Sequence, residues 1–208
     1  MRKRWWLPLM ILCVGALAVW PMRGSLTAEA IAARSPRQVG LAAGFLLLLY
    51  AVKSLSVAFP ISALEAAGGL LFPFPLALTV NLCGVLLAHM LPFLLGRQEQ
   101  TGLETLIARC PKLAALSPDS RRPGQSVFFL RLAGAAPGDL VSLYLGASGV
   151  PLRAYLLWDF VGSLPRVVAA TLLGSALWDI GSSRFWLSLL PGAAMSALSF
   201  ILWRCQKQ

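Results

Sequence analysis

Long apolar runs dominate the hydrophobic pattern of this 208-residue chain. A helix that crosses the hydrocarbon core of a bilayer needs about 20 mostly apolar residues, and five runs are long enough. The pattern therefore predicts an all-α polytopic membrane protein with about five transmembrane helices. The predicted transmembrane helices cover Trp5–Met22, Gly40–Phe59, Leu76–Gly96, Leu152–Trp178 and Phe185–Trp203.

Two other apolar segments, 59–75 and 127–149, are interrupted by proline and glycine. The first is too short to cross the bilayer and too apolar for a soluble loop, so we predict a re-entrant helical hairpin that holds Glu65 inside the membrane. An interfacial turn with Glu65 among the lipid head groups is the alternative. The second segment carries Arg131 and Asp139, and a charge at the bilayer centre costs about 2.5–3.5 kcal/mol, which marks a functional site. The alternative is that these two charges neutralise each other and only lock the hairpin.

The two hairpin segments share their spacing, because Pro60 to Gly69 and Pro137 to Gly146 span equal intervals. A single predicted transmembrane helix separates the hairpins, so they should enter from opposite faces as an inverted repeat. In such folds the half-helices meet near the midplane and build the substrate site. The expected helix breaks are Pro60, Gly68, Gly69, Pro137, Gly138, Gly146, Gly162 and Pro165.

The chain divides into three parts on this pattern. Residues 1–39 form an N-terminal anchor helix and a connecting segment, residues 40–178 form the membrane core with both hairpins, and residues 179–208 form a C-terminal transmembrane helix with a basic tail. The first apolar run is longer than the core of a secretory signal, so we expect an uncleaved anchor.

The charge pattern favours lipid over nucleic acid as the partner. The net charge of +10 comes from 18 Lys and Arg against 8 acids, and most of the excess lies in the short connections, as expected beside anionic head groups. The four cysteines show no metal-type pairing, and His89 is the single histidine, so we expect no metal, no cofactor and no enzyme activity on lipid phosphates. The sequence leaves open whether Lys53, His89 and Asp159 are functional.

Two motifs support a family resemblance. The first is a proline-bounded segment followed by an Ala-Ala-Gly and Leu-Phe run and a later Gly-Arg. The second has the form F-x-x-R, P-x-D, a later Gly and then Gly-x-x-Pro. They are formed by Pro60, Ala66, Ala67, Gly68, Leu71, Phe72, Gly96, Arg97, Phe128, Arg131, Pro137, Asp139, Gly146, Gly162 and Pro165. Over residues 40–174 the chain resembles the DedA-like superfamily of SNARE-associated Golgi (VTT-domain) proteins, in its bacterial form.

The resemblance implies a translocase, of flippase or scramblase type, that acts on a phospholipid or a polyprenyl-phosphate. It implies a multi-pass protein of the bacterial cytoplasmic membrane, with lipid phosphate head groups as partners, protons as coupling ions and a homo-oligomer left open. In this interpretation Arg131 binds the phosphate with help from Arg97 or Arg166, because guanidinium groups grip phosphate oxygens in pairs. Glu65 and Asp139 are then proton-coupling or charge-compensating groups. A non-transporting scaffold for envelope homeostasis is the alternative.

Overall fold

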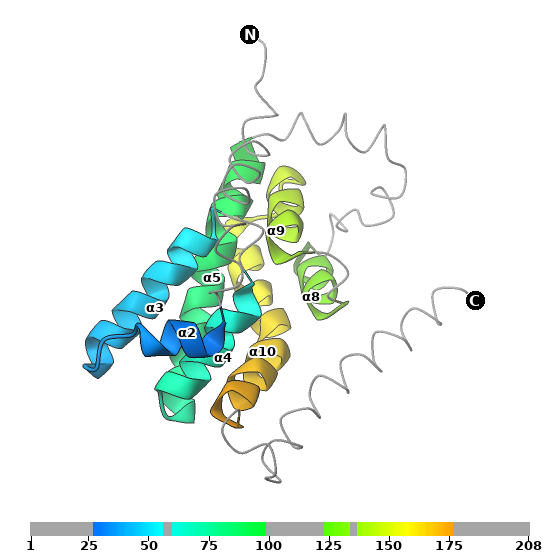
Figure 1. Ribbon diagram of the computed structural model, residues 1–208. Coiled ribbons are helices and arrows are strands. Elements are labelled where there is room, and N and C mark those ends of the chain that lie inside the picture. The colour runs from blue at the N-terminus through cyan, green and yellow to red at the C-terminus, as the bar shows by residue number, and fades with distance from the viewer. Residues whose placement is uncertain (1–26, 56–59, 99–122, 134–136, 177–208) are drawn as a thin grey trace.

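The computed structural model describes residues 27–55, 60–98, 123–133 and 137–176, and every regular element within these ranges is an α-helix (Figure 1). The predicted all-α class is therefore confirmed for the described part of the chain. The helices are α2 (Ala28–Ala33), α3 (Val39–Lys53), α4 (Ile61–Leu71), α5 (Phe74–Gln98), α8 (Pro123–Ala133), α9 (Gly138–Ala147) and α10 (Leu152–Ala176).

Helices α5 and α10 form the centre of the fold. Each has 25 residues and an apolar stretch long enough to cross a membrane. At 1.5 Å per residue each is about 37 Å long, which exceeds the roughly 30 Å hydrocarbon core. They run in opposite directions, since α5 ends at the top of Figure 1 and α10 at the bottom. By length and composition these two are the candidate membrane spans among the described residues.

None of the other three predicted spans is seen as a full-length helix in the described part of the chain. Helix α3 is a mostly apolar helix of 15 residues that overlaps the predicted span Gly40–Phe59, but it is shorter than a bilayer crossing. The spans predicted at Trp5–Met22 and Phe185–Trp203 lie outside the described residues. Large apolar side chains point outward from the bundle, among them Leu48 at 62% and Leu157 at 61% exposure, which suits a surface that faces lipid.

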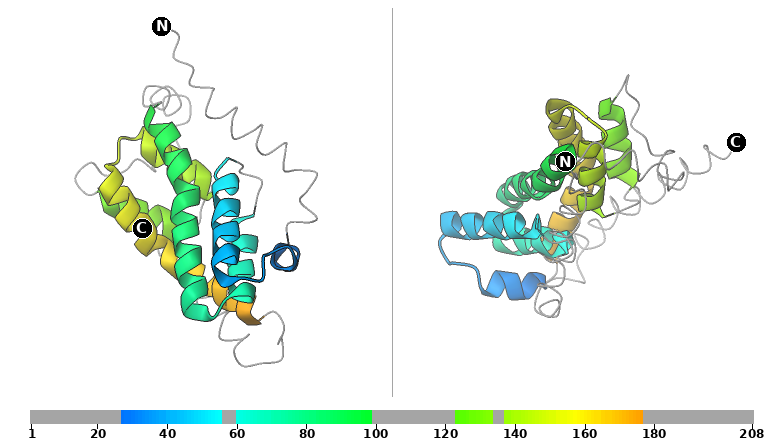
Figure 2. Two further views of the ribbon diagram at one scale, coloured as in Figure 1. Left: turned by 90° about the vertical axis from the view of Figure 1, so that its left-hand side faces the viewer. Right: turned by 90° about the horizontal axis from the view of Figure 1, so that it is seen from above.

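The described helices form two similar units, α3-α4-α5 and α8-α9-α10. Several residues of the first unit have a counterpart of the same kind 78 positions later in the second unit. Lys53 corresponds to Arg131, Gly84 to Gly162 and Gly96 to Gly174. Helix α3 packs beside α5 and α8 packs beside α10, on opposite sides of the central pair (Figure 2).

The short middle helices are exchanged between the two units, because α4 packs against α10 and α9 packs against α5. Glycines allow both contacts. A Cβ at Gly69 would collide with the Thr171 carbonyl of α10, and a Cβ at Gly146 would collide with the Phe93 carbonyl of α5. Gly174 makes the matching close approach toward α4 from α10. The backbones therefore touch at both crossings, as small residues allow within membranes.

The predicted interruption between Arg131 and Asp139 is present, since α8 ends at Ala133 and α9 begins at Gly138. Pro137 is the N-cap residue of α9, and Pro60 has the same place in α4.

Several other predicted breaks are wrong. Gly68 and Gly69 lie inside α4, and Gly146 lies in the last turn of α9. Helix α10 continues through both Gly162 and Pro165. The reason is packing: these glycines serve close contact between helices, and a proline inside a helix costs one backbone hydrogen bond that a well-packed helix can lose.

The turn after α9 shows the glycine that is needed for its conformation. Gly149 has φ = 76°, and the Val150 N–H donates to the Leu145 carbonyl at 3.3 Å. This is the Schellman ending of a helix, and Pro151 follows it at once. The turn reverses the chain so that α10 can run back through the bundle.

Candidate functional site

Helices α4 and α9 both begin at a cavity of about 190 Å³ in the middle of the bundle. From there α4 runs to the C-terminal end of α10 and α9 runs to the C-terminal end of α5, as the two glycine crossings require. The cavity is lined by Ile61, His89, Leu130, Arg131, Gly138, Val141, Ser163 and Arg166.

The cavity lies at half the length of both central helices. His89 is near the middle of α5, and Ser163 and Arg166 are near the middle of α10. If these helices span the bilayer, the cavity lies close to its midplane. Inverted-repeat transporters place their substrate sites at that depth.

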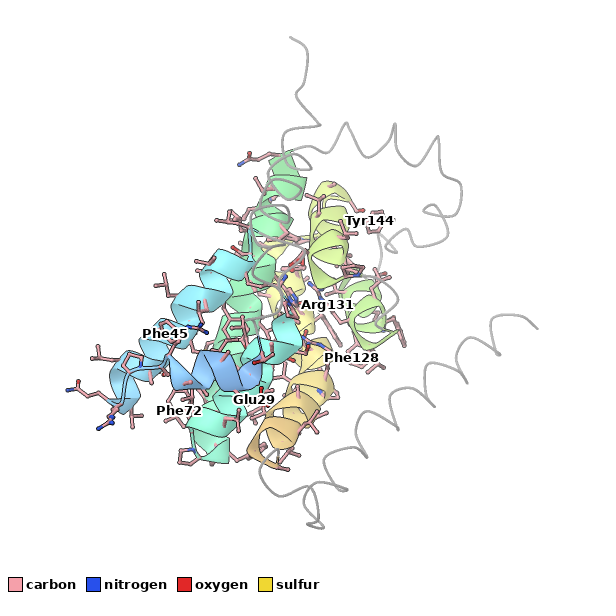
Figure 3. All side chains as sticks on the ribbon, in the orientation of Figure 1. Glu29, Phe45, Phe72, Phe128, Arg131 and Tyr144 are labelled. Atoms are coloured by element: carbon pink, nitrogen blue, oxygen red, sulfur yellow. The ribbon has the colours of Figure 1, made fainter. Side chains whose placement is uncertain are left out.

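Arg131 is held firmly by its neighbours, and Figure 3 shows it where α8, α9 and α10 come together. Its Nε donates to Asp159, its Nη1 to the Gly138 carbonyl at 2.8 Å, and its Nη2 to Ser142 Oγ at 2.7 Å and to Tyr155 Oη at 2.9 Å. Every nitrogen of the guanidinium thus has a partner. Arg131 fixes the start of α9 against α8 and α10.

Arg166 is engaged on one side alone. Its Nη1 donates to both carboxylate oxygens of Glu65, at 2.7 and 2.8 Å, and no hydrogen bond to another described residue involves its Nε or Nη2. The Arg166 side chain is 34% exposed whereas Glu65 is fully buried. The interfacial-turn alternative is wrong, because Glu65 lies inside a helix and is closed off from solvent.

Asp139 pairs with Lys53, whose Nζ donates to Asp139 Oδ1 at 2.5 Å, and both side chains are buried. Arg131 pairs with Asp159 instead, and His89 Nδ1 lies 3.1 Å from the second oxygen of that carboxylate. The alternative in which Arg131 and Asp139 neutralise each other is therefore wrong. The hairpin charges are satisfied by other helices.

The ion pairs leave the centre of the bundle electrically balanced. Three cations face three carboxylates, and of these six side chains only Arg166 is more than slightly exposed. The pairs are Lys53 with Asp139, Arg131 with Asp159, and Arg166 with Glu65.

A second polar network, which the sequence interpretation missed, centres on Asn81. Its Nδ2 donates to the Glu65 carbonyl at 2.8 Å and to Thr171 Oγ1 at 2.9 Å, and its Oδ1 accepts from Tyr50 Oη at 3.1 Å. Asn81 stands 78 positions before Asp159, so the repeat spacing was the signal that could have found it. It joins α3, α4, α5 and α10 beside the Glu65 pair.

The structure thus brings four of the five predicted site residues to the centre. Arg131 and Arg166 line the cavity, and Glu65 and Asp139 are paired beside it. Arg97 is exposed in the last turn of α5 and does not line the cavity. No three His, Cys, Asp or Glu side chains among the described residues are placed to hold a metal ion.

Comparison with known proteins gives the family. The chain is 29% identical to Transmembrane protein 41B of Danio rerio over 147 residues, which is 66% of this chain and 51% of that protein. It spans about half the length of this curated relative. No solved structure matches the chain. Residues 59–176, more than half of the chain and all of α4 to α10, match the family model of the VTT domain. The chain is therefore a member of the VTT-domain family of membrane-associated proteins.

Proposed function

We propose that this chain moves a lipid with a phosphate-bearing head group across a bilayer, with the central cavity as the head-group site. The observation that carries the proposal is the position of that cavity, halfway along two antiparallel apolar helices and lined by two arginines. Charged side chains at membrane depth are costly, and in membrane proteins they mark substrate or ion pathways. The resemblance to lipid translocases and scramblases agrees with this function.

Arg166 is the main phosphate ligand in this proposal. Its Nε and Nη2 donate no hydrogen bond to another described residue. These two groups can therefore bind a phosphate, because a guanidinium holds phosphate oxygens through two parallel N–H donors. Arg131 supports the site as a fixed positive charge at the cavity wall. Arg97, outside the cavity, plays no part.

The starts of α4 and α9 add to the attraction for an anion. Pro60 and Pro137 are the N-cap residues, and neither offers a side-chain hydrogen bond to the first turn of its helix. The first backbone N–H groups and the positive ends of two helix dipoles therefore face the cavity region.

Glu65 couples the site to protons in this proposal. A phosphate that binds Nε and Nη2 of Arg166 shares that cation with Glu65, and it adds negative charge to a centre that is already balanced. Uptake of a proton by Glu65 would restore the balance, because a buried carboxylate that loses its cation is costly. Asp139 keeps Lys53 neutralised during this exchange.

The acyl chains remain in lipid while the head group passes the cavity, since the outer faces of α3 and α10 are apolar. We place the chain as a multi-pass protein of the bacterial cytoplasmic membrane, with α4 and α9 as re-entrant helices that enter from opposite faces. Two further predicted crossings, Trp5–Met22 and Phe185–Trp203, and a homo-oligomeric state remain predictions.

Reconstitution of the purified chain alone tests the function. Liposomes with a fluorescent phosphate-bearing lipid in both leaflets are treated with a membrane-impermeant quencher, and the fraction of quenched lipid rises above one half if the protein moves lipid. Arg166→Gln should remove this increase, whereas Arg97→Gln, the matched control, should retain it. A wild-type protein that moves no lipid, with or without a pH gradient, would favour the scaffold alternative.

A further inference from the structure

Ser163 has a hydroxyl that is buried without a hydrogen bond. The residue is 2% exposed, it lies in the middle of α10, and its Oγ finds no partner within the described part of the chain. Such groups are rare in native proteins, because an unpaired buried hydroxyl loses its hydration without compensation. An unpaired hydroxyl that persists at the wall of a cavity points to a partner that enters the cavity.

Other hydroxyl groups in these helices avoid that cost by local bonding. Ser142 donates to the carbonyl four residues earlier at 2.8 Å, and Thr171 does the same at 2.7 Å. This bond to the preceding turn is the ordinary solution for serine and threonine in apolar helices. Ser163 lies in an equally regular helix and does not make it.

The cavity places Ser163 beside the charged groups of the proposed head-group site. It shares the cavity wall with Arg166, Arg131 and the start of α9 at Gly138. The serine hydroxyl can donate one hydrogen bond and the arginines can donate more, so an occupant needs several acceptor oxygens. A phosphate group meets that demand, and a cation does not.

We infer that Ser163 is a phosphate-binding residue, which donates its hydroxyl hydrogen to a head-group oxygen that Arg166 also holds. This inference rests on the proposed function and adds a neutral donor to its site. The same chemistry suits a lipid phosphate and free inorganic phosphate, and the lipid is the expected source because the cavity lies halfway along the two candidate membrane spans. A Cβ at Gly138 would meet His89 Nε2 at 2.7 Å, so the missing side chain is what lets α9 begin this close to His89 at the cavity wall.

Thermal unfolding of the full chain in an uncharged detergent tests the inference, with tryptophan fluorescence as the readout. The probes are dodecyl phosphate and inorganic phosphate, and dodecyltrimethylammonium is the cationic control. Dodecyl phosphate should raise the Tm of the wild type in a saturable way, and inorganic phosphate should do so more weakly. For Ser163→Ala the half-saturating concentration of dodecyl phosphate should rise about tenfold, the effect of one hydrogen bond to a charged group.

The unliganded Tm separates binding from a structural role. Ser163→Ala removes an unpaired buried hydroxyl, so its Tm without probe should equal or exceed that of the wild type. Ser163→Thr keeps the hydroxyl and should retain part of the affinity. Ser175→Ala is the matched control on the same helix, because Ser175 is exposed and donates to the Leu172 carbonyl at 2.8 Å; its affinity should equal that of the wild type.

Different results overturn different claims. A wild-type response that Ser163→Ala retains at the same concentration refutes the role of Ser163 and leaves the head-group site intact. A lower unliganded Tm for Ser163→Ala assigns the hydroxyl to structure and likewise refutes the inference. A wild type that responds to neither phosphate probe, or equally to the cation, refutes the head-group site and this inference with it.

Discussion

Replacing Arg131 with methionine should lower the stability of the fold even when no ligand is present. The change removes four hydrogen bonds that join α8 to α9 and α10, and it leaves Asp159 fully buried with His89 as its remaining described partner. Breaking a buried ion pair by removal of one partner costs about 3–5 kcal/mol. We therefore expect Arg131→Met to lower the free energy of unfolding by that amount.

The measurement is unfolding of the protein by increasing SDS in mixed micelles, with Arg131→Met, Asp159→Asn and the double variant compared. The double variant should lose less than the sum of the single losses, because it leaves no uncompensated charge. Arg153→Met is the control, since Arg153 is exposed on α10 and its loss should change stability by about 0.5 kcal/mol or less. The free energy of unfolding of Arg131→Met could instead lie within about 1 kcal/mol of the wild-type value, as for a contact of little importance. If that variant also moves no lipid, Arg131 is a ligand of the head group and not a structural centre.

Further predictions follow from other positions. Glu65→Gln should keep the fold but lose lipid movement driven by a pH gradient, while Glu65→Asp keeps part of it; equal gradient dependence in Glu65→Gln and the wild type would exclude proton coupling at this residue. Asn81→Asp, which buries a carboxylate without a cation, should lower the unfolding free energy by about 3 kcal/mol or more, and an unchanged SDS midpoint would contradict this. Gly146→Val should cost about 1–3 kcal/mol or more, because its Cβ meets the Phe93 carbonyl, whereas Gly40→Ala has open space within 4 Å and should be neutral or slightly stabilising in the same titration.

The sequence predicted the helical class, the two long central helices and the break between Arg131 and Asp139. These features depend on local properties, since apolar length and proline positions act within one segment. It also predicted that the two hairpin segments form an inverted repeat, which stays a prediction, and a 78-residue spacing relates the further positions Lys53 and Arg131. Local pattern fails for the remaining glycines, because a glycine that breaks a helix and one that allows another helix to approach look the same in a sequence.

The ion-pair partners were beyond prediction from sequence order. Arg131 and Asp139 are eight residues apart, yet their partners come from helices far along the chain: Asp159 for the arginine and Lys53 for the aspartate. The exchange of α4 and α9 between the two units accounts for the Lys53–Asp139 pair, because it carries α9 to α5 beside α3, whereas Arg131 and Asp159 meet within one unit, where α8 packs against α10. A prediction would have needed the direction in which each short helix packs, which depends on glycines in both members of each crossing.

The buried charges themselves argue for function over stability. Three ion pairs in the core of an apolar chain must each repay the desolvation of two charges, and well-packed apolar side chains of similar volume often give equal or greater stability. Arg131 with Asp159 and Lys53 with Asp139 are buried pairs whose charged groups are bonded to neighbouring helices, so they explain how the start of α9 is positioned. Arg166 also lines the cavity, but its side chain is one-third exposed while its partner Glu65 is fully buried. A pair with one open cation and one enclosed carboxylate can admit an incoming anion to the open side of the cation without opening the bundle, and this asymmetry is the physical reason to look for the ligand at Arg166.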